Sequence, residues 1–459
     1  MVRGRCDLSH LGFAAVVLAA GKGTRMNSGI PKVLQKVCGR ELLNLVIDAS
    51  TSAGISQVSV VVPKDHSSFS KTIKRRGQLS IQQSAEGSGH ALLAAREHVH
   101  SYENIIVLNG DVPLISHSTI QNMMQNHTEK KSIITVLVCE VPDPKGLGRI
   151  IRDDTGNLIS IVEENETNQS NRHTSEINAG IYCFNNSWLW KTVEYLKPSR
   201  SGEIYITDLI ALAHKQGISI QSFTTHDQNE IKGINNKIDL SVVENIMRKN
   251  ICEELMLKGV TIIDPNSTYL DHGVKVGKDS VIHPNCHIRG NTNIGIRTTV
   301  GPNTIIRDSD IGDDCNIINS VIEETIMGNG VAIGPFSHTR KGTKLDNNVH
   351  IGNHAEIKNS TLGPGTKMGH FSYIGDADVG ANVNIGAGTI TCNYDGTNKN
   401  RTTIKDEAFI GSDTMLIAPV KVGRKSITGA GSVISKNVPD NSKAVGAPAR
   451  IMRGAKRSL

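Results

Sequence analysis

Aromatic side chains are scarce in this sequence, at 3% of its 459 residues, so aliphatic side chains must build the cores. No apolar segment is long enough to cross a bilayer. The first residues, MVRGRCDLSHLGF, contain no apolar stretch of the length found in secretory leaders. We therefore expect a protein of the cytoplasm without a membrane partner.

The sequence also lacks closely spaced cysteine pairs and a large net charge. The eight cysteines are scattered and form no C-x-x-C pair, which favours buried thiols in a reducing compartment. The net charge of +6 is too small to indicate a dedicated nucleic-acid binder. It fits a protein that binds small anionic substrates at local sites.

The first half of the chain alternates short apolar runs with helix-like segments. The apolar runs cover residues 14–18, 58–62 and 105–108, and HALLAAREHV between the last two has helical spacing. This alternation predicts βαβ units and a mostly parallel α/β sheet. Ligands of such sheets bind beyond the carboxyl ends of the strands, where LAAGKGTRMNSGIPKVL and NGD both lie.

A period of six residues begins near Val260. It predicts a left-handed parallel β-helix of hexapeptide repeats, in which each repeat forms one side of a triangular coil with its aliphatic residue inside. Glycine, asparagine and aspartate would form the corners. The predicted interior positions are Val276, Ile282, Ile288, Ile294, Val300, Ile306, Leu345, Ile351, Ile357, Leu362, Met368, Ile374, Ile404, Ile410, Leu416 and Val422.

One long helix is expected between the two halves. Val243, Met247, Ile251 and Leu255 recur every four residues, and Gly259 ends the segment. We therefore predict a nucleotide-binding domain at 1–237, a linker helix at 238–259 and a β-helix domain at 260–459.

The glycine-rich stretch after the first apolar run is neither a P-loop nor a dinucleotide fingerprint, because Met26 stands where the latter needs its third glycine. Its backbone N–H groups can still approach an anion, and Lys22, Arg25 and Lys32 add charge suited to a triphosphate. Taken alone, such a turn is as typical of an ordinary strand-to-helix connection as of a phosphate-binding site.

The motifs that follow favour the functional interpretation. LAAGKGTRM, the PK at 31–32 and LNGDVPLIS resemble the sugar-nucleotide pyrophosphorylases, and QSAEGSGHA, GLGRII, IVEE, EINAGIY, YITDLI and KGINN occur in that family's order. Together with the β-helix, they make residues 16–447 similar to a family of bacterial bifunctional enzymes. These enzymes combine N-acetylglucosamine-1-phosphate uridylyltransferase and glucosamine-1-phosphate acetyltransferase activities.

This resemblance implies a UTP and UDP-N-acetylglucosamine site with Mg²⁺ in the first half. Its implied lining is Leu18, Ala19, Ala20, Gly21, Lys32, Gln82, Gly87, Ser88, Asn109, Gly110, Asp111, Gly148, Glu163, Asn178 and Asn235. Arg25 and Lys32 would be catalytic, since both would stabilise the triphosphate and the departing pyrophosphate. Asp111 and Asn235 would ligate Mg²⁺ through oxygen. Ser88 and Asn109 depart from the threonine and tyrosine that are commoner in relatives.

In the second half, KMGHFSYIGDADVGANVNIGAGTITCNYDGTNK interrupts the hexads with a polar insertion from Cys392 to Thr403. Such an insertion is poor core material and indicates an active-site loop. An isolated histidine is more often structural, but His370 lies within GHFSYIGD, which matches the acetyltransferase of that family. The resemblance makes His370 the general base, a task that suits an imidazole near neutral pH.

The resemblance also implies two substrate-binding sets around His370. The set for glucosamine 1-phosphate is Arg340, Lys358, Tyr373, Asn384 and Lys399. The set for acetyl-CoA is Ala387, Asn393, Tyr394, Ser412 and Ala430. Ala447 stands where the family often has an arginine that grips the cofactor, and whether Arg450 substitutes for it is left open.

We therefore expect a bifunctional enzyme that acetylates glucosamine 1-phosphate and then transfers UMP from UTP to the product. The resemblance also implies a homotrimer formed through the β-helix, and the insertion supports it because it would project toward a neighbouring chain. One alternative is a pyrophosphorylase of single activity with a structural β-helix, against which His370 and the insertion count. A catalytically dead regulatory subunit is another, and Lys32, Asp111 and Asn235 count against it.

Overall fold

The computed structural model of the chain describes residues 12–73, 76–169, 171–172, 174–199 and 202–453. Cys6 and the stretch in which we looked for a secretory leader lie outside the described residues, apart from Gly12 and Phe13. The chain divides into two compact units between Met247 and Arg248, inside helix α8 (Lys237–Leu257). We keep α8 as the proposed linker between domains at 1–237 and 260–459.

The N-terminal unit is built on a nine-stranded sheet whose main order is β11-β7-β10-β6-β1-β4-β5. The three predicted apolar runs form its parallel centre, as β1 (Phe13–Leu18), β4 (Gln57–Pro63) and β6 (Asn104–Asn109). A central antiparallel strand, β10 (Glu176–Asn185), pairs with β6 and with β7 (Ile134–Glu140). The outer strands are β5 (Gln78–Gln82), β11 (Ile220–Thr224), β8 (Gly148–Arg152) and β9 (Leu158–Val162).

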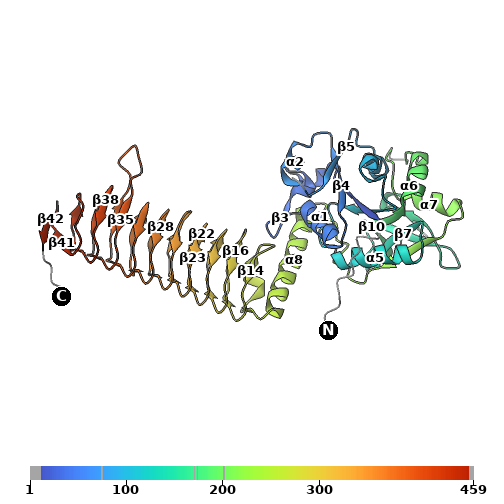
Figure 1. Ribbon diagram of the computed structural model, residues 1–459. Helices are drawn as coiled ribbons and strands as arrows, with labels where there is room; N and C mark the ends of the chain where they lie inside the picture. Colours follow the sequence, from blue (N-terminus) through green and yellow to red (C-terminus); the bar gives the residue numbers. More distant parts are fainter. Residues whose placement is uncertain (1–11, 74–75, 170, 173, 200–201, 454–459) are drawn as a thin grey trace. The chain divides into compact units, whose positions relative to one another are not determined.

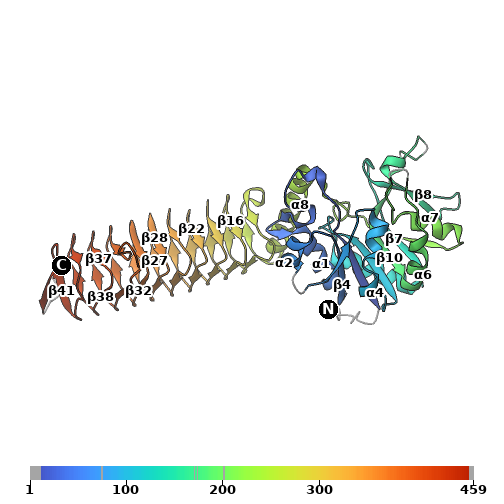
Figure 2. The same ribbon diagram turned by 90° about the horizontal axis from the view of Figure 1, so that it is seen from above.

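Helices cover both faces of this sheet (Figures 1 and 2). One core contains side chains of α1 (Leu42–Ser52), α2 (Ser67–Ile73) and α5 (His117–Glu129). The opposite core contains side chains of α3 (Ser88–Leu93), α4 (Arg96–Val99), α6 (Asn186–Thr192) and α7 (Asp208–Lys215). Short elements complete the unit: η2 (Thr24–Met26), η3 (Lys32–Leu34), β2 (Lys36–Val37), β3 (Arg40–Glu41), η4 (Glu164–Glu166) and η5 (Val193–Tyr195).

The second unit is the predicted left-handed β-helix, whose coils visit three parallel sheets in turn (Figure 1). We call these sheets faces 1, 2 and 3. Face 1 holds β12 (Thr261–Ile262), β15 (Val281–Ile282), β18 (Thr299–Val300), β21 (Asn316–Ile317), β24 (Ala332–Ile333), β27 (His350–Ile351), β30 (Lys367–Met368), β33 (Asn384–Ile385), β36 (Phe409–Ile410), β39 (Ile427–Thr428), β41 (Ser442–Val445) and β42 (Arg450–Arg453).

Faces 2 and 3 follow face 1 in every coil. Face 2 holds β13 (Tyr269–Leu270), β16 (His287–Arg289), β19 (Ile305–Arg307), β22 (Val321–Glu323), β25 (His338–Thr339), β28 (Ala355–Lys358), β31 (Ser372–Gly375), β34 (Ile390–Cys392), β37 (Met415–Ile417) and β40 (Val433–Ile434). Face 3 holds β14 (Lys275–Val276), β17 (Asn293–Ile294), β20 (Asp310–Ile311), β23 (Ile326–Met327), β26 (Lys344–Leu345), β29 (Thr361–Leu362), β32 (Ala377–Val379), β35 (Thr402–Ile404) and β38 (Val420–Val422).

The predicted interior positions are buried, except that Val276 is only partly so. The apparent phase break after Ile306 reflects shorter coils rather than an interruption. Ile288 pairs with Ile306 eighteen residues on, whereas Ile306 pairs with Ile322 only sixteen residues on. Cys252 and Leu255 of α8 belong to the same core as the interior residues of the β-helix. The end of α8 therefore covers the first coil. At the other end β42 turns back antiparallel on β41.

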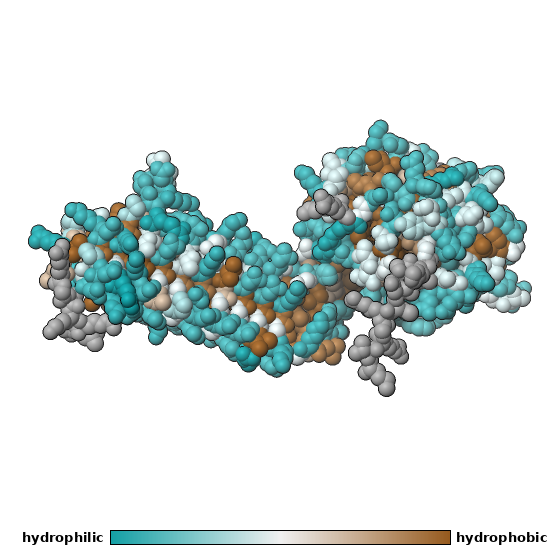
Figure 3. All heavy atoms as spheres, viewed as in Figure 1, coloured by the Kyte–Doolittle hydropathy of each residue, from teal (hydrophilic) through white to brown (hydrophobic). Residues whose placement is uncertain are grey.

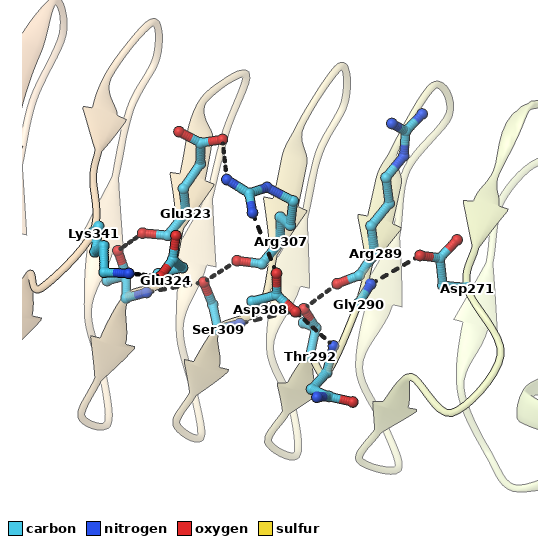
Figure 4. Close-up of polar contacts among 12 residues, drawn as sticks. Asp271, Arg289, Gly290, Thr292, Arg307, Asp308, Ser309, Glu323, Glu324 and Lys341 are labelled. Atoms are coloured by element: carbon cyan, nitrogen blue, oxygen red, sulfur yellow. Dashed lines mark hydrogen bonds and ion pairs between the residues drawn. The ribbon is translucent and has the colours of Figure 1, made fainter. Parts of the chain in front are cut away.

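The corners use the left-handed backbone conformation, as expected for asparagine and aspartate. Figure 4 shows how the corner after face 2 is tied from coil to coil. The Gly290 N–H donates to an Asp271 carboxylate oxygen at 2.9 Å, and Arg307 Nη2 pairs with Glu323 Oε1 of the next coil, also at 2.9 Å. Glu324 has a positive φ although it is bulky, and the neighbouring coil contributes Lys341 as its ion-pair partner. These contacts hold successive coils in register.

Within the described ranges, no helix is both long and apolar enough to cross a bilayer. The cysteines there are free thiols, all buried except Cys392, which is half-buried. Figure 3 shows hydrophobic side chains running along the β-helix between hydrophilic ones.

Burial of His127 on α5 makes the stability of the N-terminal unit depend on pH. Its Nδ1 lies 2.8 Å from Thr135 Oγ1, while its buried Nε2 has no hydrogen-bond partner among the described residues. Burial lowers the pKa of His127 to about 4. The unfolded chain takes up this proton near pH 6.5 and the folded chain does not, so acidification from pH 7 to pH 4 should cost about 3 kcal/mol.

Urea unfolding followed by tryptophan fluorescence tests this expectation, because both tryptophans, Trp188 and Trp190, lie in α6 of this unit. His127→Gln removes the titrating ring, so its free energy of unfolding should fall about 3 kcal/mol less than that of the unsubstituted chain over the same pH range. Equal pH dependence in the two proteins would contradict the assignment.

Candidate active sites

A pocket of about 490 Å³ lies at the carboxyl ends of β1, β5 and β6, where the sequence places its glycine-rich stretch. The predicted residues that line it are Leu18, Ala19, Ala20, Gly21, Lys32, Gln82, Gly87, Ser88, Asn109 and Asp111. Gly110 lies beneath them and donates its N–H to the Leu18 carbonyl at 2.9 Å. Lys22, whose charge the sequence analysis had already singled out, also lines the pocket, as do Thr24, Ala85 and Glu203, which were not among the predicted site residues.

The loop after β1 returns on itself at Gly23, whose φ is +59°. A Cβ atom on Gly23 would come within 2.7 Å of Lys32 Cβ, so only glycine lets the two segments pass. The close approach brings Lys32 from η3 back to the pocket. The glycine turn therefore positions a cation as well as exposing backbone N–H groups.

Lys32 and Arg25 of this loop each contact a side-chain oxygen of another segment. Lys32 Nζ pairs with Asp111 Oδ2, and Arg25 Nη2 donates to Asn235 Oδ1 at 2.9 Å. The two oxygen-bearing residues are neighbours, because the Ile234 N–H donates to the Asp111 carbonyl at 3.0 Å. Asn235 is fixed in turn by its backbone N–H, which donates to Asp239 in the first turn of α8 at 2.8 Å.

Carboxylate and amide oxygens are ligands that suit Mg²⁺, and both already attract a cation here. The described residues contain no group of three or more His, Cys, Asp or Glu side chains that could enclose a metal ion. A metal at Asp111 and Asn235 would therefore take its remaining ligands from water and substrate oxygens, as Mg²⁺ commonly does.

Gly148, Glu163 and Asn178, which the resemblance also placed in this lining, meet beside the pocket. Gly148 of β8 lies opposite Asn178 of β10, and a Cβ on Gly148 would be 3.7 Å from Glu163 Oε2. A register shift between Asn178 and Tyr182 kinks β10. At this bulge Gly180 has a φ of +73°, and a Cβ there would meet the Asn109 side chain at 2.3 Å. The bulge thus connects Asn178 to the residue that ends β6.

Glu163 is the one ionisable residue among Gly148, Glu163 and Asn178, and its surroundings disfavour its charged form. Burial raises its pKa, as do the nearby carboxylates of Asp208, Glu166 and Glu203, while a hydrogen bond from Thr207 Oγ1 at 3.0 Å opposes the rise. Ile206 precedes Thr207, and its backbone N–H donates to Ser88 Oγ at 3.0 Å. Thr207 belongs to the YITDLI motif, but nothing in the sequence alone revealed that it holds Glu163.

A second pocket, of about 640 Å³, runs along face 1 of the β-helix. The predicted residues His370, Asn384, Ala387, Ser412 and Ala430 line it. Further lining residues that the sequence did not indicate are His350, Lys367, Phe409, Ile427 and Lys443, which occupy outward positions of successive strands. Among the residues that the structure describes, neither Asp nor Glu lines this pocket.

The other predicted acetyltransferase residues gather on face 2 and at the corner that follows it. Lys358 ends β28, and Lys399 reaches it from the insertion, which projects from the coils (Figure 1). The contact with Lys399, together with nearby Arg340, lowers the pKa of Lys358. Arg340 also pairs with Glu356 at 2.8 Å. Three cations thus converge on one corner, an arrangement that suits a phosphate.

Asp376 anchors the base of the insertion at this corner. Burial alone would raise its pKa, but hydrogen bonds from Asn359 and Asn393 and the nearby lysines outweigh burial and lower it. Tyr394 is exposed and bonds through its hydroxyl to the Gly396 carbonyl at 2.6 Å.

Each predicted substrate set is therefore divided between two faces. Asn384 lies with His370 on face 1, apart from Arg340, Lys358, Tyr373 and Lys399. Ala387, Ser412 and Ala430 line the face 1 pocket from the turns that follow β33, β36 and β39, whereas Asn393 and Tyr394 belong to the insertion.

Comparison with known proteins extends over both units. The nucleotidyl transferase family matches residues 14–231. The bifunctional protein GlmU of Clostridioides difficile is 41% identical over 444 residues, which cover 96% of this chain and 97% of that protein. Those of Carboxydothermus hydrogenoformans and Thermosipho africanus are each 43% identical, over 94% of this chain and 96% and 94% of their own lengths.

A raised pKa for Glu163 means that its ionised form destabilises the folded N-terminal unit. The folded chain binds this proton more tightly than the unfolded chain, so stability is lost as the pH rises through the folded pKa. Glu163→Gln should therefore raise the free energy of unfolding at pH 8 by on the order of 1 kcal/mol, and the gain should shrink on acidification and vanish below about pH 4.

Urea unfolding monitored by the same two tryptophans measures this difference. Asp208→Asn provides a comparison, because Asp208 is a neighbouring carboxylate whose pKa is also raised by burial. A Glu163→Gln protein that is less stable at pH 8 than at pH 4.5, relative to the unsubstituted chain, would contradict the prediction.

Proposed function

The chain belongs to the family of bifunctional GlmU proteins, and on this basis we propose that each of its units carries one active site for UDP-N-acetylglucosamine synthesis. The β-helix acetylates glucosamine 1-phosphate with acetyl-CoA. The N-terminal unit then transfers UMP from UTP to N-acetylglucosamine 1-phosphate and releases pyrophosphate. The main support is the presence of two separate pockets, each lined by groups suited to one reaction. The free thiols support a reducing compartment, and we propose the cytoplasm.

In uridylyl transfer, an oxygen of the sugar phosphate attacks the α-phosphorus of UTP, and the bond to pyrophosphate breaks. The nucleophile is already ionised, so the reaction needs positioning and charge stabilisation rather than a general base. Lys32 and Arg25 move from Asp111 and Asn235 to the phosphate oxygens. Asp111 and Asn235 would hold Mg²⁺, which neutralises charge on the triphosphate.

The sugar is bound by Gly148, Glu163 and Asn178, which lie together at the side of this pocket. The Glu163 carboxylate accepts a hydrogen bond from a sugar hydroxyl, while Thr207 fixes its other oxygen. Gly148 leaves room for the sugar ring, since it presents no side chain beside Glu163. Gln82, Gly87 and Ser88 face the nucleotide base from β5 and α3.

In acetyl transfer, His370 accepts a proton from the amino group of glucosamine 1-phosphate. The nitrogen attacks the thioester carbon, the C–N bond forms, and the C–S bond breaks to release the thiolate of CoA, which takes up the proton that His370 removed from the nitrogen. Arg340, Lys358 and Lys399 provide positive charge for the sugar phosphate, with Tyr373 beside them. No metal is required for these steps.

Single substitutions should separate the two activities. His370→Ala removes the proposed base and should reduce acetyl transfer at least 100-fold, with uridylyl transfer unchanged within twofold. Asp111→Asn weakens the proposed metal site and should have the reverse effect. CoA thiol release and pyrophosphate release, measured separately, report the two reactions.

Chelation provides an independent control for this experiment. EDTA should stop pyrophosphate release and leave thiol release intact, because only the phosphoryl reaction uses Mg²⁺. A protein that releases pyrophosphate but no thiol would favour the single-activity pyrophosphorylase. Loss of both activities in either well-folded variant would contradict two independent sites.

We also propose a homotrimer that assembles through face 2 of the β-helix. Outward positions on this face include Tyr269, Ile305 and Ile390, which are 40%, 41% and 37% exposed. The equivalent row on face 3 is mostly polar and includes Lys275, Asp310, Lys344, Asp378 and Lys421. The row also contains His287, His338 and Glu356, and a largely apolar row with polar members is typical of a protein interface. A neighbouring chain could then bring its corner cations to the His370 pocket, which would complete the divided site.

An acidic substitution in the apolar row should weaken this assembly. Ile305→Glu places like charges around the threefold axis, so the trimer should dissociate at a protein concentration at least tenfold higher, and acetyl transfer should fall with it. Ile326→Glu on face 3 is the matched control, since Ile326 is also exposed but lies outside the proposed interface. Light scattering over a dilution series gives the mass relative to the 49.5 kDa chain. A monomer with full acetyl transfer would refute the proposal.

A further inference from the structure

Ala447 stands where relatives often have a cofactor-binding arginine, so another cation of this chain would have to bind the cofactor. Arg450, the candidate left open above, pairs with Val445 in the terminal hairpin and lines a separate pocket of about 320 Å³ with Lys436 and Ile434. Lys443, by contrast, lines the face 1 pocket together with His370. We propose that Lys443 binds the phosphate groups of acetyl-CoA in this protein. The inference rests on the proposed acetyl transfer and names a further residue of that site.

The position of Lys443 follows from the register of face 1. Its neighbour Ala444 is buried inside the last coil, so Lys443 points outward. Pairing along the face joins Lys367, Asn384, Phe409, Ile427 and Lys443 in one row. Since neighbouring strands lie about 4.8 Å apart, four steps place Lys443 about 19 Å from the strand that precedes His370.

This span matches the shape of the acyl donor. The arm between the sulfur and the first phosphorus of CoA is about 16 Å long when extended, given ordinary bond lengths. With the thioester carbon beside His370, the arm would follow the face 1 row over Phe409 and Ile427 and bring the phosphates to Lys443. Between the ends, Gly386, Gly411 and Gly429 line the pocket at the corner that follows face 1.

The electrostatics of the pocket favour the same orientation. Within the described part of the chain, its lining contains no carboxylate and no ion pair involves Lys443. Ammonium groups bind phosphate through charge-assisted hydrogen bonds, which are about twice as strong as neutral ones. Lys443 follows the apolar side chains of Phe409 and Ile427 at the end of the row, so it can distinguish a phosphate-bearing donor from a short thioester.

Calorimetric titration with CoA tests the proposal without relying on catalysis. Lys443→Met should weaken CoA binding at least tenfold, because it removes a charged hydrogen bond, and Lys443→Arg should restore most of the affinity. Lys436→Met and Arg450→Met are matched controls from the separate pocket, and both should bind CoA as the unsubstituted chain does. In the acetyl transfer assay, Lys443→Met should raise the KM for acetyl-CoA and leave kcat and the KM for glucosamine 1-phosphate near their original values.

Truncated ligands identify which phosphate is bound. With pantetheine, which lacks every phosphate, the Lys443→Met protein and the unsubstituted chain should bind equally. With dephospho-CoA, a persisting difference assigns Lys443 to the diphosphate, and loss of the difference assigns it to the 3′-phosphate.

Three results would overturn the inference: unchanged CoA affinity in Lys443→Met, an equal loss of affinity for pantetheine, or an effect of Arg450→Met as large as that of Lys443→Met. If the unsubstituted chain bound CoA but released no thiol from acetyl-CoA, the proposed acetyl transfer would fail instead. The two failures are therefore distinguishable.

Discussion

The stacking of parallel strands at one fixed spacing is the constraint on which the β-helix and its site depend. Each coil must return to the same corner with an aliphatic side chain inside, so the outward side chains of each face fall into straight rows. His370, Asn384 and Lys443 line one elongated pocket only because the interior residues Met368, Ile385 and Ala444 fix their coils. The core therefore determines the surface on which the chemistry takes place.

Both candidate sites use cations that the protein holds against its own oxygens before any ligand arrives. Lys32 and Arg25 contact Asp111 and Asn235 in the N-terminal unit, and Arg340 pairs with Glu356 in the β-helix. Such pairing limits the number of conformations available to long side chains and lowers the entropic cost of binding phosphate. Lys358 and Lys399 differ, because these two like charges face each other and an anion between them would relieve their repulsion.

The sequence was sufficient to predict features set by short-range periodicity. The six-residue period located the interior of the β-helix, and the ends of the apolar runs located Leu18, Asn109 and Asp111 at one edge of a sheet. It could not predict the bulge between Asn178 and Tyr182, since the register of β10 is decided by its pairing with β6, β7 and β8. Nor could it place Lys443, because the outward row depends on coils of unequal length and on a loop inserted before Thr402.

The turn of β42 back onto β41 has a consequence for the order in which the β-helix melts. A coil inside a solenoid has two neighbours, whereas an end coil has one, so such a structure frays from its ends like a one-dimensional lattice. At the C-terminal end the antiparallel return of β42 supplies the missing neighbour for β41. The coil that carries Lys443 is thereby protected from fraying, and a ligand that spans several strands of face 1 would clamp the terminal coils together and make them unfold as one unit.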